Sequence, residues 1–359
     1  MTGMDVDREA AERELVKSVV SFIEREVRPV EERHSRELRE TGTLDPVIQD
    51  RERRLLRRRS AELGFYGMGL PEEVGGSGVS PLGVAWALDA VGASGLLLAD
   101  RGGVLPNVEG PSVAMVGVMS EAQRKEYLEP LVRAEREGCW GITEPGAGSD
   151  VSGMRTKAVR DGDDWLISGT KQFITHGAYA DFVQVVAVTD PDLGNRGLTT
   201  FLVDRGTKGF TVGSTHRTLG EDRPVDLHFD NVRVSNDAIV GTRGGAMAYA
   251  LRGIGLARIH VAALALGKSR YLLKRMIDQA NDRHAFGRPI GAFQMVQQQI
   301  VDSSMEVDCA AGLVEAAARA AHRDDAEARR LSRPVPRLSP LRRCRVWPIG
   351  PSRSSVEAE

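Results

Sequence analysis

The residues best suited to chemistry lie in one twelve-residue stretch, Cys139-Trp140-Gly141-Ile142-Thr143-Glu144-Pro145-Gly146-Ala147-Gly148-Ser149-Asp150. Gly146 and Gly148 let the backbone approach a ligand closely, because glycine has no Cβ. Pro145 favours a turn whose backbone N–H groups can face an anion. Thr143 and Ser149 add hydroxyls that can donate or accept hydrogen bonds. Gly-Ala-Gly alone would indicate a hairpin turn, whereas the full stretch is more specific and favours a ligand cradle.

The titratable residues elsewhere indicate no second centre. His176, His260 and His284 have no acidic partner at metal-ligand spacing, so we expect structural roles for them and no metal site. Asp150 is expected to order its own turn rather than to react.

Composition excludes several function classes. With 359 residues the chain is long enough for two or three domains, and its formal net charge of −2 gives no global attraction to nucleic acid or anionic membranes. No uncharged apolar run approaches the roughly 20 residues that a membrane-spanning helix needs. The start of the chain has no signal-peptide features. The three cysteines are too far apart for a disulfide framework or a zinc site, which fits a reducing cytoplasm: Cys139, Cys309 and Cys344.

Helical patterns precede the twelve-residue stretch. Residues 5–40 predict a charged amphipathic helix with a kink or break at Pro29. The run from Arg51 to Arg59 predicts a solvated helix face, because it is short and lacks the interleaved aromatic residues of a nucleic-acid patch. A Gly- and Pro-rich loop follows at 63–78, and helical patterning returns over 80–138.

Strand patterns and then helical patterns follow the twelve-residue stretch. Four short apolar runs bounded by turn pairs predict strands of an antiparallel sheet: Trp165–Gly169, Phe182–Val188, Thr199–Val203 and Val225–Phe229. Two long helices are predicted at Gly244–Arg283 and Phe293–His322, separated by Gly287 and Pro289. Helices, then strands, then helices indicate an α+β fold. No strand-linked Gly-x-Gly-x-x-Gly is present, so a Rossmann unit is not indicated.

The twelve-residue stretch, the block Gly169–Gly177 and the block around Arg283 together resemble the acyl-CoA dehydrogenase flavoproteins, and the likeness covers most of residues 55–323. The resemblance implies four regions: an N-terminal helical domain (1–138), a middle antiparallel β domain (139–243), a partial C-terminal helical bundle (244–325) and an aberrant tail (326–359). The composition of the tail predicts disorder.

The resemblance also implies a cofactor, FAD, and the residues that bind it: Trp140, Ile142, Thr143, Ser149, Phe173, Thr175, Arg283, Phe286 and Gln294. The last three would reach the flavin diphosphate and adenosine across a subunit boundary. Ser149, Gly255 and Arg258 match positions that contact the substrate. Phe173 stands where tryptophan is common; an aromatic ring can shield a flavin face, and a nearby hydroxyl can tune its hydride affinity.

No catalytic base can be assigned from the resemblance. In this family a glutamate removes the α-proton of an acyl thioester while the β-hydrogen leaves as hydride to the flavin, and a carboxylate suits that role in a dry pocket. Most relatives carry it far down the C-terminal bundle, at a position that falls beyond Glu359. A minority carry it directly before the arginine matched by Arg258, where this chain has Ala257.

The sequence of the tail, residues 326–359, suggests a frame shift. From about Leu331, Pro, Ser and Arg replace the Ala-rich helix of the family. One choice of synonymous codons for Arg330–Glu359, read in another frame, gives a family-like segment with Gln-Ile-Phe-Gly-Gly. We hypothesise a frame shift near residues 323–331 that removes the last two bundle helices and the base and impairs catalysis. The nucleotide sequence of the gene tests this hypothesis.

The resemblance therefore implies an oxidoreductase of fatty-acid metabolism. Its expected reaction is FAD-dependent α,β-dehydrogenation of an acyl-CoA or acyl-carrier thioester, with an electron-transferring flavoprotein as acceptor. A cytoplasmic homo-oligomer, a dimer or a tetramer, is expected. Two alternatives stay open: a flavin-dependent monooxygenase or oxidase of the same fold, and a non-catalytic remnant or assembly subunit.

Overall fold

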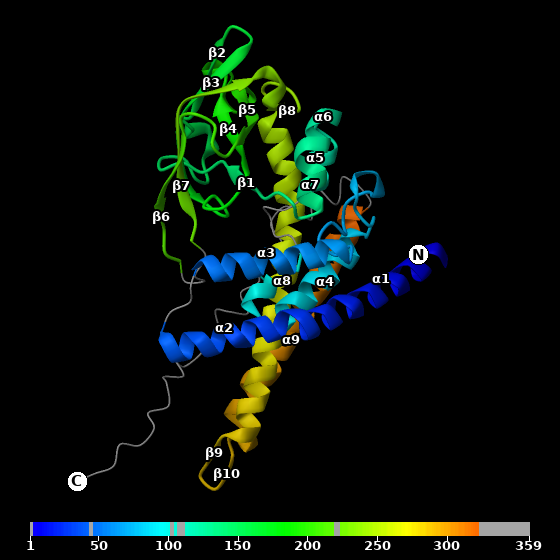
Figure 1. The fold of residues 1–359 in the computed structure, drawn as a ribbon. Helices are drawn as coiled ribbons and strands as arrows, with labels where there is room; N and C mark the ends of the chain where they lie inside the picture. The colour runs from blue at the N-terminus through cyan, green and yellow to red at the C-terminus, as the bar shows by residue number, and fades with distance from the viewer. Residues whose placement is uncertain (1–2, 43–45, 101–103, 106–111, 219–222, 323–359) are drawn as a thin grey trace, which may run out of the picture.

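The computed structural model describes residues 3–42, 46–100, 104–105, 112–218 and 223–322. The tail predicted at 326–359 lies outside these residues, so its disorder and the frame shift stay predictions. Helices form the lower body in Figure 1, a β-sheet stands above them, and one long helix runs from the sheet through the body. The predicted α+β order of helices, sheet and helices is confirmed.

The N-terminal part is helical, as predicted. Its elements are α1 (Gly3–Phe22), η1 (Ile23–Val27), α2 (Arg28–Thr41), α3 (Pro46–Glu62), η2 (Glu72–Val74), α4 (Pro81–Ala93), α5 (Val113–Val116), α6 (Glu121–Gln123), η4 (Arg124–Leu128) and α7 (Glu129–Val132). The helix does not end at Pro29, because η1 is a π-helical turn that precedes the proline and accommodates its missing N–H. Val19, Ile23 and Val27 form a buried stripe along this line of helices.

The predicted solvated face of Arg51–Arg59 is wrong for two of its arginines. Arg53 and Arg57 are only 6% and 2% exposed. Arg53 Nη2 lies 3.1 Å and Arg57 Nη1 2.9 Å from Oε1 of Glu137, which is itself buried just before the first strand. A buried guanidinium needs a paired carboxylate, and this carboxylate comes from a segment about eighty residues further on, so the local sequence did not reveal it.

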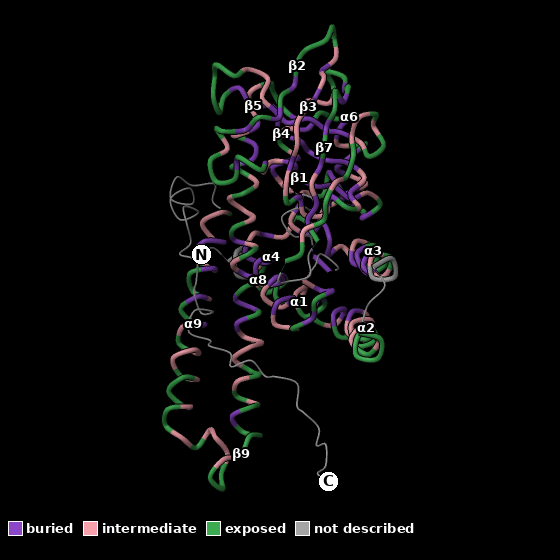
Figure 2. Tube along the Cα trace, turned by 90° about the vertical axis from the view of Figure 1, so that its left-hand side faces the viewer, coloured by how far each residue is buried: buried purple, intermediate pink, exposed green. Residues whose placement is uncertain are grey.

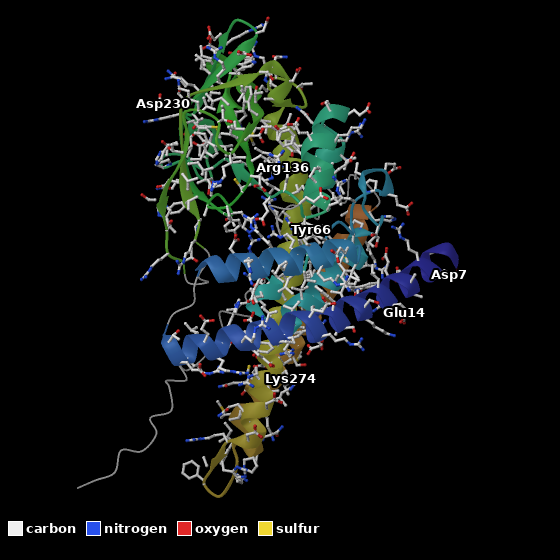
Figure 3. The ribbon with its side chains drawn as sticks, in the orientation of Figure 1. Asp7, Glu14, Tyr66, Arg136, Asp230 and Lys274 are labelled. Atoms are coloured by element: carbon white, nitrogen blue, oxygen red, sulfur yellow. The ribbon has the colours of Figure 1, made fainter. Side chains whose placement is uncertain are left out.

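A second contact joins the sheet to the helices, beside Arg136, which Figure 3 labels at the foot of the sheet. Arg136 Nη2 donates to Asp204 Oδ1 at 2.6 Å, and its guanidinium lies over the rings of Tyr127 and Phe182 at 4.8 and 5.2 Å. Stacking of arginine on aromatic faces adds to the ion pair. The foot of the sheet is therefore fixed to the helical body at two places.

The sheet has eight strands in the order β6-β7-β3-β2-β4-β5-β8, with β1 paired to β4. The strands are β1 (Gly138–Gly141), β2 (Lys157–Asp161), β3 (Asp164–Ile174), β4 (Phe182–Val188), β5 (Leu198–Asp204), β6 (Phe210–Thr215), β7 (Val225–Ser235) and β8 (Ile239–Val240). All four predicted strands are present. Most pairs are antiparallel, as predicted, but β1 and β2 each pair with β4 in parallel. Short 3-10 helices lie between strands: η5 (Val151–Gly153), η6 (Pro191–Gly197) and η7 (Asn236–Ala238).

The C-terminal part is a helical hairpin. Helix α8 (Ala246–Asp282) leads into the strands β9 (His284–Ala285) and β10 (Arg288–Pro289), then η8 (Ile290–Ala292) and α9 (Gln294–His322). Helix α8 packs on α4 and α9. In Figure 2 the lower parts of α8 and α9 are largely exposed or intermediate, so α8 is less buried than its apolar pattern predicts.

Helix α8 is also the one helix within the described residues that is long and apolar enough to cross a membrane by length and composition. Its apolar stretch carries Arg252 and Arg258, so it is not an uncharged run. Core helices of proteins in water meet the same criterion. The contacts of α8 with α4 and α9 cover part of this stretch.

Candidate functional site

The twelve-residue stretch forms β1 and a tight turn after it. Glu144 N–H donates to the Ala147 carbonyl at 2.9 Å, and Ala147 N–H donates back to the Glu144 carbonyl at 3.2 Å, so Pro145 and Gly146 form a two-residue turn. A Cβ built on Gly146 or Gly148 would meet no atom within 4 Å. The bend is therefore a hairpin turn that is open at its two glycines.

A buried ion pair fixes this bend from the inside. Lys171 Nζ, on β3, donates to Glu144 Oε1 at 2.8 Å and to the Ile142 carbonyl at 3.1 Å. Glu144 also accepts the backbone N–H groups of Arg155 and Thr156 at 2.7 and 3.0 Å. Because Glu144 joins both ends of the segment from 144 to 156, the pair determines the position of the whole bend.

Burial and pairing shift the ionisation of both partners. Lys171 is fully buried, and this burial lowers its pKa to about 8 against the opposing effect of Glu144. For Glu144, burial opposes ionisation, yet its hydrogen bonds with Lys171, Arg155 and Thr156 hold its pKa below the usual value. Both groups are therefore charged near neutral pH. Sequence reasoning missed this pair, although the alternation along β3 from the buried Trp165 and Ile167 places Lys171 on the same inward face.

The end of β3 lies beside the bend. Gln172 N–H donates to the Thr143 carbonyl at 2.8 Å, which joins β3 to the end of β1. The register with β7 shifts between Lys171 and Ile174, and Phe173 takes a left-handed backbone with φ of 59°. Such a bulge re-aims a side chain: the ring of Phe173 is 53% exposed. Thr175 follows in a half-buried turn.

The other aromatic residue of the stretch, Trp140, is held by α8. Its ring lies 4.8 Å from the ring of Tyr249, whose hydroxyl donates to Gln184 Oε1 on β4 at 2.5 Å. The side chain of Ile142 packs with the cluster around Met154. Adjoining segments carry six of the residues predicted to bind FAD, and their role in binding stays a prediction: Trp140, Ile142, Thr143, Ser149, Phe173 and Thr175.

The other three residues predicted to bind FAD lie far from the bend. Arg283, Phe286 and Gln294 surround the β9–β10 hairpin, at the opposite end of α8 from the sheet (Figure 1). Helix α8 has 37 residues, which at about 1.5 Å each separates its two ends by roughly 55 Å. Phe286 is 95% exposed with φ of 52°. One copy of the chain therefore does not bring this group to the bend.

The predicted substrate residues lie on α8 between these ends. Gly255 has open space around it, and Arg258 is exposed one turn further on. Ala257, between them, is half-buried and has no group that can accept a proton. No base is assigned among the described residues of the site.

Three observations concern the other titratable groups. Asp150 Oδ1 accepts the backbone N–H of Ser152 at 3.0 Å, which confirms that it orders its turn. Burial, and then the charges of Arg57 and Arg53, hold the pKa of His176 well below its usual value. No group of three or more His, Cys, Asp or Glu side chains within the described ranges is placed to hold a metal ion.

These residues fit a flavin. The open side of the bend offers room, Trp140 and Phe173 offer aromatic surfaces, and Thr143 and Thr175 offer hydroxyls. A flavin would supply the acceptor of a hydride, which none of these side chains can provide.

Comparison with known proteins decides the family. Three family models match: acyl-CoA dehydrogenase N-terminal domain at 9–135, middle domain at 139–232 and C-terminal domain at 244–333. An acyl-CoA dehydrogenase of Bacillus subtilis is 32% identical over 267 residues, which is 73% of this chain and 69% of that protein. The chain belongs to the acyl-CoA dehydrogenase family. It is therefore a flavoprotein oxidoreductase by family, and the predicted fold class is confirmed.

Two solved structures share this fold with 28% sequence identity. One is butyryl-CoA dehydrogenase from Megasphaera elsdenii, with a TM-score of 0.75. The other was solved in work on the electron transferring flavoprotein of Acidaminococcus fermentans, with a TM-score of 0.76. Each match covers 89% of this chain and 83% of the other.

Proposed function

We propose that this acyl-CoA dehydrogenase family member catalyses FAD-dependent α,β-dehydrogenation of an acyl thioester, carried on CoA or on a carrier protein. The observation that carries the proposal is the hydrogen bond from Gln172 to Thr143, which joins the open bend to the end of β3. Two aromatic residues and two threonines lie on these two joined segments, and a Cβ at Gly146 or Gly148 in the bend would meet no atom within 4 Å.

The proposed cofactor is FAD, bound by two groups of residues. Trp140 and Phe173 would exclude water from the ring system, and the hydroxyls of Thr143, Ser149 and Thr175 would donate hydrogen bonds to it. Ile142 would contribute apolar contact. Arg283, Phe286 and Gln294 would come from a second copy, because they lie at the far end of α8. This makes a homo-oligomer, a dimer or a tetramer, part of the proposal.

The substrate would lie along α8. Arg258 is an exposed cation suited to the phosphate groups of CoA, and Gly255 leaves room beside it. Ala257 cannot take the α-proton, so we propose impaired dehydrogenation by the chain as its sequence stands. The proposed electron acceptor is an electron-transferring flavoprotein, in agreement with the second structural match.

We also propose the boundaries of the three domains and the cellular location of the protein. We place the boundaries at 138/139 and 243/244, supported by the start of β1 at Gly138 and of α8 at Ala246. We also propose a cytoplasmic location.

Anaerobic titration tests the reaction. Purified, FAD-loaded chain is mixed with a panel of acyl-CoAs, and the flavin absorbance is followed. Slow bleaching by at least one acyl-CoA is expected, and an Ala257→Glu variant, which restores a carboxylate beside Arg258, is expected to bleach faster. The matched control is Ala265→Glu, because Ala265 is exposed on α8 about two turns beyond Ala257.

The same sample separates the alternatives. Oxygen consumption by reduced flavin without reduction by any acyl-CoA would favour a monooxygenase or oxidase of this fold. A folded protein that neither retains flavin nor reacts would favour the non-catalytic reading.

A further inference from the structure

Phe173 adopts a conformation that the rest of β3 does not require. Its φ of 59° lies in the left-handed region, which is unfavourable for a bulky side chain. Phe173 is 53% exposed, so hydrophobic burial does not compensate for this strain. Strain of this kind at the end of a strand is typical of functional positions. Something other than the core must hold the ring.

His216 makes the ring contact. The imidazole of His216 and the ring of Phe173 have centroids 4.5 Å apart, at an interplanar angle of 58°. His216 follows directly after β6, whose pairing with β7 shifts register between Val212 and Thr215, near the shift in β3. The two register shifts therefore lie close to the contact between His216, just after β6, and Phe173, which bulges from β3.

His216 is itself fixed at both its backbone and its side chain. Its N–H donates to the Pro224 carbonyl at 2.8 Å, and its Nε2 lies 2.7 Å from Asp226 Oδ1. The Asp226 side chain is 14% exposed. Its neighbours Val225 and Leu227 are buried, so alternation along β7 places Asp226 on the opposite face of the sheet. An imidazole so held cannot turn away from Phe173 without losing its hydrogen-bond partner.

We propose that Asp226 and His216 form a brace that positions the ring of Phe173 for flavin binding. The proposal rests on the proposed function, because Phe173 is there a flavin contact. His216 and Asp226 act through Phe173 and are positioning residues. The brace lowers the entropic cost of ordering an exposed aromatic side chain when the cofactor binds.

A double-mutant cycle on FAD affinity tests the brace. Dissociation constants are measured by quenching of FAD fluorescence for wild type, His216→Ala, Phe173→Ala and the double variant. We expect His216→Ala to weaken FAD binding roughly fivefold to tenfold in wild type and by less than about twofold in the Phe173→Ala background. His216→Phe keeps an aromatic contact but loses the bond to Asp226, so it is expected to restore only part of the affinity, and Asp226→Asn is expected to give an intermediate loss.

His228→Ala is the matched control. His228 lies two residues from Asp226 on the same face of β7, and its Nδ1 lies 3.2 Å from Thr170 Oγ1 rather than beside Phe173. Its removal is expected to leave FAD affinity unchanged, and unfolding temperatures of the FAD-free variants show that each protein folds.

Two other outcomes would contradict the proposed brace. An equal loss from His216→Ala with and without the Phe173 ring, or no loss at all, overturns the brace and leaves the proposed function standing. Folded wild-type protein that binds no FAD overturns the proposed function and the brace with it.

Discussion

At the scale of single residues, the position of the bend depends on Lys171 and Glu144. The two charges are buried, and their bonds hold the Ile142 carbonyl and the backbone of 155–156 around the bend. Burying such charges is costly unless they remain paired. We therefore assign the pair the role of positioning the bend, rather than of stabilising the sheet.

Lys171→Met tests this pair. The change leaves Glu144 buried with only its backbone donors, so we expect the free energy of unfolding to fall by about 3 kcal/mol and FAD binding to weaken. Urea unfolding and FAD titration measure the two effects. Lys157→Met is the control, because Lys157 is exposed on the neighbouring strand β2. Equal effects of the two substitutions would contradict the proposed role of the pair.

His260 gives a pH prediction. Burial on α8 lowers its pKa to about 4, below the ordinary value of 6.5. As the pH falls from 6.5 to 4, the unfolded chain binds a proton that the folded chain does not, so stability present above pH 6.5 is lost. The loss is at most about 3 kcal/mol. Urea unfolding at several pH values is expected to show a shallower acid loss for His260→Gln than for wild type, whereas His284→Gln, at an exposed site, follows wild type. Parallel curves for all three proteins would be inconsistent with this assignment.

At the scale of elements, the site depends on the close crossing of α4 and α8, because α8 carries Tyr249 and Arg258. A Cβ on Gly267 would lie 2.0 Å from the Asp89 carbonyl, and one on Gly92 2.3 Å from the Leu264 carbonyl. Only glycine at these two positions permits the two backbones to approach so closely.

Gly267→Ala tests the crossing. The methyl group overlaps backbone that cannot swing away, so we expect a loss of about 3 kcal/mol in the free energy of unfolding. Gly312→Ala, at an exposed position of α9 with open space around it, is expected to stabilise the chain by about 0.5–1 kcal/mol instead. Denaturant unfolding compares the two variants, and a neutral Gly267→Ala would show that α4 and α8 can separate.

At the scale of the whole molecule, an apolar surface lies along the helical hairpin. Large hydrophobic side chains on α8 and α9 remain between 38% and 69% exposed: Leu251, Ile254, Val261, Ile277, Met295, Val301, Met305 and Leu313. Exposed apolar side chains in this number favour association. The proposed homo-oligomer would cover part of it.

Charges on this surface test association. The double variant Val301→Lys/Met305→Lys is expected to sediment with a lower apparent mass than wild type, because it adds two cations one helical turn apart to the apolar surface. Gln299→Lys, on another side of α9, is the control. A wild-type chain that sediments as a monomer would remove the basis of this expectation.

Local patterns predicted most of the fold and part of the site. β4 was predicted with its observed bounds, and α9 differs by one residue at its start. Contacts between distant segments could not be predicted in this way: the parallel pairing of β1 with β4, and the burial of Arg53 against Glu137, depend on packing across the fold. The bulge at Phe173 was also missed, because phenylalanine has no intrinsic preference for a left-handed backbone.

The most direct measurement of the central claim is a titration of FAD into the purified, flavin-free chain and into isosteric Thr→Val variants. We expect saturable binding, weakened roughly tenfold by Thr143→Val and by Thr175→Val, since each removes a hydroxyl worth about 1.4 kcal/mol. Thr211→Val, at an exposed position of β6, is expected to bind as wild type does. Absence of binding by folded protein, or equal affinities for all four proteins, would contradict the assignment of the bend as the flavin site.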